Sequence, residues 1–111
     1  MSAVPTSVLV RIDATVPWEA AWDPDTGTYI GVCRPLNLNA IGDTWQEFQE
    51  CANDAIALLL TSLLQHDELA VFLRQNGWTL RTPLPPPGVV VRWDVPSAVQ
   101  VRARADELVP A

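Results

Sequence analysis

The chain has 111 residues, a length at which one compact domain can bury somewhat more than half of the surface that the unfolded chain exposes. A hydrophobic content of 49% with 18% charged residues excludes a disordered chain, which needs low hydrophobicity and high net charge. Thirteen acidic against seven basic residues give a net charge of −6, which repels a phosphate backbone and favours a basic protein partner over nucleic acid.

The first half of the sequence has the alternation typical of β-strands. Residues 7–16 alternate with a period of two and predict a first strand. The segment EAAWDPDTGTYIGVCR, residues 19–34, predicts a β-hairpin, because Pro24 suits the first turn position and Gly27 supplies a positive φ. A short strand within residues 35–43 completes a predicted three-stranded antiparallel meander.

The alternation also predicts the two faces of this sheet. On the second strand of the hairpin, Ile30 and Val32 are expected to face the core, with Tyr29 and Cys33 on the opposite side. A meander with one apolar face needs a cover, which we expect from the helices that follow.

The first predicted helix begins at Thr44. The segment TWQE fits a capping box, in which the Thr44 hydroxyl accepts from the amide of Glu47 and the Glu47 carboxylate reaches back to the amide of Thr44. Leu58 and Leu60 flank its apolar stripe, so the helix is apolar over more of its circumference than one contact requires. The stripe itself comprises Trp45, Phe48, Ala52, Ala55, Ile56, Leu59 and Leu63.

A second, shorter helix is predicted between Asp67, which can cap its start, and Gly77, which suits the left-handed residue after its end. Trp78 then falls where a Schellman motif packs an apolar residue back on Leu73. The proline-rich segment TPLPPPG predicts a stiff extended linker, GVVVRWDV a strand, and the residues after Pro96 a partly helical end.

Together these elements predict an α+β fold: a three-stranded antiparallel meander packed on one long and one short helix (β-β-β-α-α), with an extra C-terminal strand. We expect a domain at residues 1–80 and a proline-rich linker with a C-terminal strand or tail at residues 81–111. Cys33 and Cys51 lack a C-x-x-C spacing and are expected to be reduced and packed, with a single disulfide as the alternative. No apolar run of membrane-spanning length and no signal-peptide layout occur, so a cytoplasmic protein is expected.

Residues suited to catalysis or metal binding are scarce. His66 is the sole histidine, and its place between two predicted helices is typical of a solvated or capping residue. One histidine and two distant cysteines cannot complete a zinc site, DPDTG is a turn sequence, and no glycine-rich phosphate loop is present. We expect no catalytic residue, no metal, no cofactor and no enzymatic activity.

The candidate sites are therefore surfaces for recognition. Glu47, Glu50 and Asp54 lie at helical spacing and form either a solvated face or an acidic docking strip for a basic partner. Of the five tryptophans, those in or beside predicted strands are either core residues or interface anchors: Trp18, Trp22 and Trp93. The predicted interface comprises Trp22, Tyr29, Glu47, Glu50, Asp54, Leu58, Leu60 and Trp93.

Four stretches occur in this order along the chain: WDPDTGTYIGVC, PLNL, GDTWQEFQECANDAI and ELAVFLRQNGW. Through these stretches the sequence resembles the HicB-type antitoxin family over roughly residues 8–78. The resemblance implies a sheet packed on helices, similar to the double-stranded-RNA-binding architecture. It also implies that the protein neutralises a small basic RNA-cleaving toxin of the HicA type by binding it. Many members of that family carry a C-terminal DNA-binding domain. Because only a few, proline-interrupted residues follow Trp78, the resemblance is to a short member without an evident one, and promoter binding is not expected.

The leading functional expectation is thus an antitoxin-like binding module that forms a dimer or tetramer and occludes a basic toxin. The alternative is an orphan, self-associating structural or accessory protein with no toxin partner. A small hydrolase built on His66 is a third reading.

Overall fold

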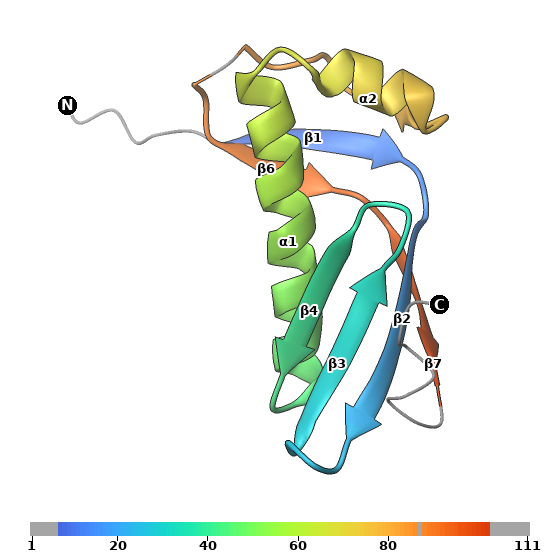
Figure 1. The fold of residues 1–111 in the computed structure, drawn as a ribbon. Coiled ribbons are helices and arrows are strands. Elements are labelled where there is room, and N and C mark those ends of the chain that lie inside the picture. The colour runs from blue at the N-terminus through green and yellow to red at the C-terminus, as the bar shows by residue number, and fades with distance from the viewer. Residues whose placement is uncertain (1–6, 87, 103–111) are drawn as a thin grey trace, which may run out of the picture. The chain divides into compact units, whose positions relative to one another are not determined.

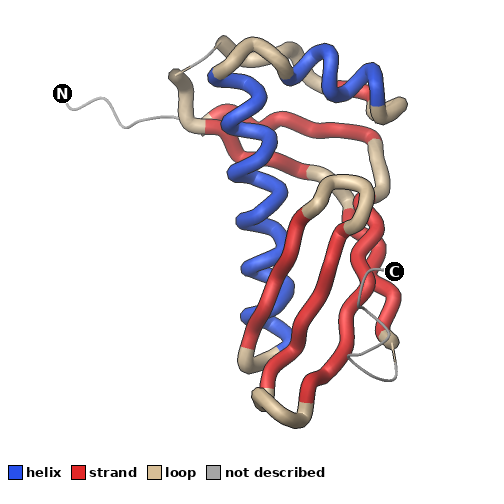
Figure 2. Tube along the Cα trace, viewed as in Figure 1, coloured by secondary structure: helices blue, strands red, loops and turns tan. Residues whose placement is uncertain are grey.

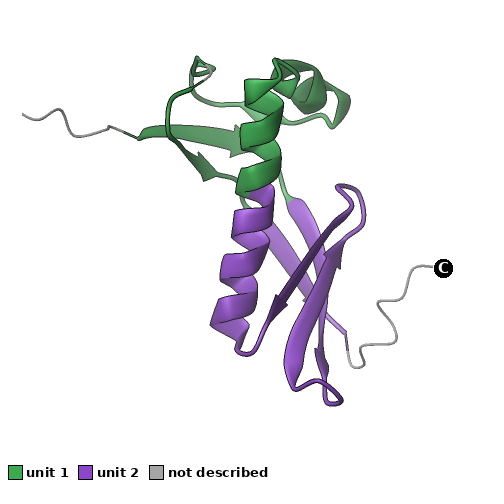
Figure 3. Ribbon diagram, turned by 60° about the vertical axis from the view of Figure 1, so that its left-hand side comes forward, with its two compact units in different colours: residues 1–15, 57–96 green, residues 16–56, 97–111 purple. Residues whose placement is uncertain are grey.

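The computed structural model describes residues 7–86 and 88–102 (Figure 1). Contacts divide the chain into two compact units (Figure 3). Unit 1 comprises residues 1–15 and 57–96, and unit 2 comprises residues 16–56 and 97–111. The long helix α1 (Trp45–Gln65) contributes its first part to unit 2 and its second part to unit 1.

Unit 2 is a four-stranded sheet with the first part of α1 packed on one face. The strand order is β4-β3-β2-β7; β2, β3 and β4 are antiparallel neighbours, and β7 runs parallel to β2. The predicted hairpin turn is present, with Gly27 at φ +69° and its amide donating to the carbonyl of Asp23 at 2.8 Å. The strands are β2 (Val16–Asp23), β3 (Thr28–Cys33), β4 (Leu38–Gly42) and β7 (Ser97–Val101).

Unit 1 combines a smaller sheet with the second part of α1 and the short helix α2 (Leu69–Gln75). The strand order is β5-β1-β6, in which β1 pairs antiparallel with β5 and parallel with β6. The strands of both units are red and the helices blue in Figure 2. These strands are β1 (Val8–Asp13), β5 (Thr79–Leu80) and β6 (Val91–Asp94). The core of the unit comprises Val10, Ile12, Leu60, Leu64, Leu69 and Leu73.

The predicted α+β class is confirmed, but the predicted meander on two helices is only part of the fold. Seven described strands form two sheets, and β2, β3 and β4 supply the meander order within one of them. Residues 7–23, expected to give one strand and the start of a hairpin, form two strands that are separated at Ala14 and Thr15. The extra C-terminal strand is in fact two strands, β6 and β7, which pair with β1 and β2.

The division expected at residue 80 does not match the two units, because the strands that follow it join both sheets. The partly helical end predicted after Pro96 is wrong for Ser97–Val101, which form the strand β7, and the part of that segment after Arg102 lies outside the described residues. Neither helix of the described chain is long and apolar enough to cross a membrane.

The predicted faces of β3 are reversed in the structure. Cys33 is fully buried, and Tyr29 contacts the Trp45 ring on α1, so these residues face the helix. Ile30 and Val32 lie on the other face and are half-buried. The reversal places Gly31 against α1, where a Cβ atom would collide with the Phe48 ring, so glycine allows helix and sheet to approach closely.

The capping box at the start of α1 is present with one change. The Thr44 hydroxyl accepts from the Glu47 amide at 3.1 Å, as predicted, but the Glu47 carboxylate accepts from the amide of Asp43 at 3.0 Å. Farther along the helix, Leu60 is fully buried whereas Leu58 is 72% exposed. The deepest line of α1 runs at four-residue steps and comprises Phe48, Ala52, Ile56, Leu60 and Leu64.

Both helices end in Schellman motifs. At the end of α2, the amides of Gly77 and Trp78 donate to the carbonyls of Arg74 and Leu73, as the sequence predicts. At the end of α1, Asp67 takes the left-handed position with φ +58°, and its amide donates to the carbonyl of Leu64. Asp67 therefore ends α1 rather than capping α2.

The two motifs predict opposite changes in stability: one when glycine replaces Asp67, and the other when alanine replaces Gly77. Asp67→Gly should raise the free energy of unfolding by about 0.5 kcal/mol, because it removes left-handed strain at some cost in unfolded-state entropy. Gly77→Ala, at φ +69°, should lower it by about 1 kcal/mol. Urea denaturation of both variants measures the two changes, and a loss of stability in Asp67→Gly would contradict this account.

Candidate interaction surface

Five aromatic rings of unit 2 contact one another in series from the core to the surface. Trp18, 1% exposed, meets Phe48 edge to face at 6.3 Å between ring centroids, and Phe48 stacks on Trp45 at 5.2 Å. Trp45 meets Tyr29 at 5.3 Å, and Tyr29 meets Trp22 at 4.8 Å. Trp22 ends the series and is 43% exposed. A large surface aromatic is thus fixed by packing that reaches into the core.

Carboxylates lie at the same end of unit 2 as the exposed ring of this series. Asp23 follows Trp22 directly and shapes the turn, its two oxygens accepting from the amide of Asp25 at 3.0 Å and the hydroxyl of Thr26 at 3.1 Å. Tyr29 stands opposite Gly42 in the sheet, so the start of α1 lies at the same end of unit 2. The side chains that define this acidic–aromatic surface are Trp22, Asp23, Tyr29, Asp43, Trp45 and Glu47.

The excess negative charge of the described chain lies in unit 2. Unit 1 has four basic residues, Arg11, Arg74, Arg81 and Arg92, balanced by Asp13, Asp67, Glu68 and Asp94. The described part of unit 2 has two basic residues, Arg34 and Arg102, against Glu19, Asp23, Asp25, Asp43, Glu47, Glu50 and Asp54.

Both of these arginines bind the same carboxylate. Glu19 accepts from Arg102 through Nη2 at 2.5 Å and from Arg34 through Nε at 2.7 Å. These hydrogen bonds, that of Arg102 first, hold the pKa of Glu19 below its ordinary value. Within residues 16–56 and 97–102, the other six carboxylates form no ion pair, so their charge is not neutralised by a described basic side chain.

The Glu19 cluster predicts a specific dependence of stability on pH. A folded-state pKa below the ordinary value of 4.5 means that the cluster stabilises the fold above that pH and loses this effect as the pH falls through the folded pKa. Glu19→Gln should therefore lower the melting temperature at pH 7 and flatten its decline on acidification. Circular dichroism melts across the acid range measure this, with Glu50→Gln as an exposed control, and parallel profiles for Glu19→Gln and the wild type would contradict it.

The structure separates the predicted interface residues into distinct places. Trp22, Tyr29 and Glu47 lie in the acidic–aromatic surface, and Glu50 and Asp54 extend it along the exposed side of α1. Trp45, which the sequence predicts to be a core residue, and Asp43 also belong to this surface but were not among the predicted interface residues. The short loop that connects β4 to α1 is the sequence feature that could have identified both.

The remaining candidates do not join this surface. Leu58 is exposed, but Leu60 is fully buried, so the surface role predicted for Leu60 does not hold. Trp93 is half-buried and its indole donates to the hydroxyl of Thr61 at 3.0 Å within unit 1, which makes it a packed residue. Trp18 is a core residue as well.

His66 and the two cysteines lie in different parts of the described chain and differ in exposure. His66 is exposed, with Nδ1 2.7 Å from the carbonyl oxygen of Ser62 at the end of α1. Cys33 and Cys51 are free thiols, and burial raises the pKa of Cys33, which disfavours the nucleophilic thiolate. Among residues 7–86 and 88–102, no three histidine, cysteine, aspartate or glutamate side chains gather as metal ligands.

Comparisons of the chain with protein-family models, with curated proteins and with solved structures give no match. The acidic–aromatic surface presents carboxylates and a half-exposed tryptophan ring at one end of unit 2.

Proposed function

We propose that this chain is a HicB-type antitoxin-like protein, which neutralises a small basic RNA-cleaving toxin by binding it through the acidic–aromatic surface of unit 2. The supporting observation is that carboxylates without an ion-pair partner among the described residues lie at the end of unit 2 that carries Trp22, a half-exposed ring. An arginine or lysine of the partner can lie on the indole face while the carboxylates pair with its charge. The order of sequence motifs adds support from a separate direction.

The carboxylates have a second effect, on the rate of association. A field of one sign speeds the encounter with an oppositely charged partner, and salt weakens this effect. The same field repels a phosphate backbone, which supports a protein partner over nucleic acid. Within this proposal the protein acts in the cytoplasm, as a dimer or tetramer, without a cofactor or catalytic activity of its own.

A self-associating accessory protein without a toxin partner is the second candidate function. Leu58 favours it, because this leucine is 72% exposed on α1 and the described residues leave it uncovered. Under this alternative, the acidic–aromatic surface binds no basic toxin.

Neutralisation of a toxin tests the proposal. The toxin candidate is the product of a small, basic, histidine-containing reading frame next to this gene, assayed for RNA cleavage with and without the purified full chain. We expect loss of cleavage at stoichiometric amounts of the chain. Active cleavage despite excess chain, together with no complex on size-exclusion chromatography, would overturn the proposal in favour of the accessory protein.

Charge reversal identifies the surface. Asp54→Lys and Glu68→Lys change the net charge equally, at exposed positions in unit 2 and unit 1. We expect Asp54→Lys to weaken toxin binding several-fold, mainly through slower association, and to reduce its salt dependence. Glu68→Lys should bind like the wild type, and equal losses in both variants would assign the effect to net charge alone.

A further inference from the structure

The strand β7 forms one edge of the unit 2 sheet. It pairs with β2, and within the described residues no strand pairs with its other side. The amide of Arg102 donates to the carbonyl of Ala20 at 2.7 Å, toward β2. Backbone direction alternates along a strand, so the amides of Ser97, Val99 and Val101 point away from β2. No strand among the described residues uses these groups.

This edge lacks the features that usually prevent pairing. Protein sheets protect their edges with charged side chains, prolines or bulges. Residues 97–101, SAVQV, contain no charge and no proline, and Val101 is 64% exposed. The preceding Pro96 and the following Arg102, which is held by Glu19, limit the open segment to these five residues.

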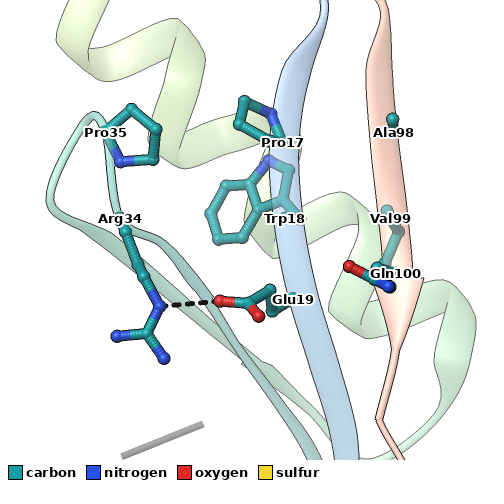
Figure 4. A pocket seen from close by; sticks show the side chains of 8 residues that line it. All are labelled: Pro17, Trp18, Glu19, Arg34, Pro35, Ala98, Val99 and Gln100. Carbon is teal, nitrogen blue, oxygen red and sulfur yellow. Dashed lines mark hydrogen bonds and ion pairs between the residues drawn. The ribbon is translucent and has the colours of Figure 1, made fainter. Parts of the chain in front are cut away.

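Two hollows in unit 2 open beside this strand. The larger, about 550 Å³, lies among Pro17, Pro35 and the β7 residues Ala98, Val99 and Gln100 (Figure 4). The smaller, about 220 Å³, is lined in part by Trp18, Ser97 and Val99. Among the described residues, the buried indole nitrogen of Trp18 is a donor without a hydrogen-bond partner. An added strand would bring side chains over these hollows, as in β-strand addition.

We propose that β7 pairs antiparallel with β7 of a second copy of this chain, about a two-fold axis at Val99. In this register, Val99 exchanges backbone hydrogen bonds with its own copy, and Ser97 exchanges them with Val101 of the other protomer. The outward amides are the ones that this register uses. Ala98 then stands opposite Gln100, so no charged side chains meet along the pair.

The distribution of charge is compatible with a second copy in this orientation, and the uncharged strand sequence allows the two copies to pair. β7 is parallel to β2, and β2 ends at the acidic turn of Asp23 and Asp25. Antiparallel pairing places the acidic–aromatic surfaces of the two protomers at opposite ends of an eight-stranded sheet, which keeps their mutual repulsion low. This inference goes beyond toxin binding and does not depend on it, because either surface can act without the other.

Disulfide trapping at two positions of β7 tests the two-fold axis. In a Cys51→Ser background, Val99→Cys places two thiols across the axis within reach of a disulfide. Val101→Cys is the matched control: it lies on the same face and is more exposed, but its two copies would stand about 13 Å apart along the strands. We expect oxidation to trap Val99→Cys as a dimer several-fold more efficiently than Val101→Cys.

Light scattering of the unmodified full chain provides the second measurement. The expected mass rises from monomer to dimer with concentration, and Val99→Pro, which removes an outward amide, shifts it back toward monomer. If the chain is a monomer at every concentration and Val99→Cys is not trapped, the proposal is overturned. The partner of the β7 edge would then be the chain beyond Arg102 or another protein. Equal or better trapping of Val101→Cys would overturn the register. Failure to neutralise a toxin would leave both measurements unchanged.

Discussion

Replacing Gly42 with alanine should lower the free energy of unfolding by about 3 kcal/mol or more, the largest loss expected for any single added methyl group in unit 2. The Cβ atom would overlap backbone atoms of Glu47 and Phe48 in the first turns of α1. Backbone in a capped helix cannot yield as a flexible side chain can, so relief requires α1 to move away from the sheet. That movement would open the packing of Phe48, which is fully buried.

The loss of stability expected at Gly42 comes from a steric clash. A substitution at a second glycine measures, for comparison, the cost of a positive φ alone. Gly27 has a φ of +69° and open space around its Cα, so Gly27→Ala should cost only about 1 kcal/mol. Urea denaturation followed by tryptophan fluorescence compares the two variants. A loss at Gly42 no greater than that at Gly27 would show that α1 and β4 are not in tight contact.

Local sequence signals predicted the elements whose hydrogen bonds close within a few residues. The Thr44 cap, the Gly27 turn and the motif at Gly77 each join atoms that are three to five residues apart, so residue type alone carries the information. The pairing of β6 with β1 and of β7 with β2 joins segments about eighty residues apart. A strand-like composition such as GVVVRWDV contains no information about its partner, and for that reason the second sheet was not predicted.

The errors in side-chain direction arose where both faces of an element are apolar. On β3, Tyr29 and Cys33 alternate with Ile30 and Val32, and either pair could face a core; Gly31 decides, because only its face admits the Phe48 ring. On α1, Leu58 and Leu60 are equivalent in composition, and the four-residue line through Phe48 and Leu64 buries only Leu60.

The sequence predicted several residues of the candidate surface, but it did not predict which residues lie together. Trp22, Tyr29 and the helix carboxylates were identified from turn and spacing signals. Their grouping depends on the register that sets Tyr29 opposite Gly42, which brings Trp45 and Asp43 to the hairpin end. The arginines meet at Glu19 because β7 pairs with β2, a contact that no local pattern reveals.

Trp22→Ala should have the largest effect on partner binding. A tryptophan anchor at the centre of an interface contributes about 2 kcal/mol or more, which corresponds to roughly 30-fold in affinity. Val71→Ala is the matched control, since Val71 is an apolar residue of unit 1 with 44% exposure against 43% for Trp22. We expect Val71→Ala to bind the toxin as the wild type does.

The rate constant that changes, association or dissociation, distinguishes an aromatic anchor from a charge that steers association. Removing a desolvated ring should accelerate dissociation and leave association nearly unchanged, whereas Asp54→Lys should slow association. Trp22→Phe should recover part of the affinity, because it keeps an aromatic face for a cation. Surface plasmon resonance with the toxin measures both rates at two salt concentrations. If Trp22→Ala dissociates no faster than Val71→Ala, the ring is not part of the interface and binding must use another surface of the chain.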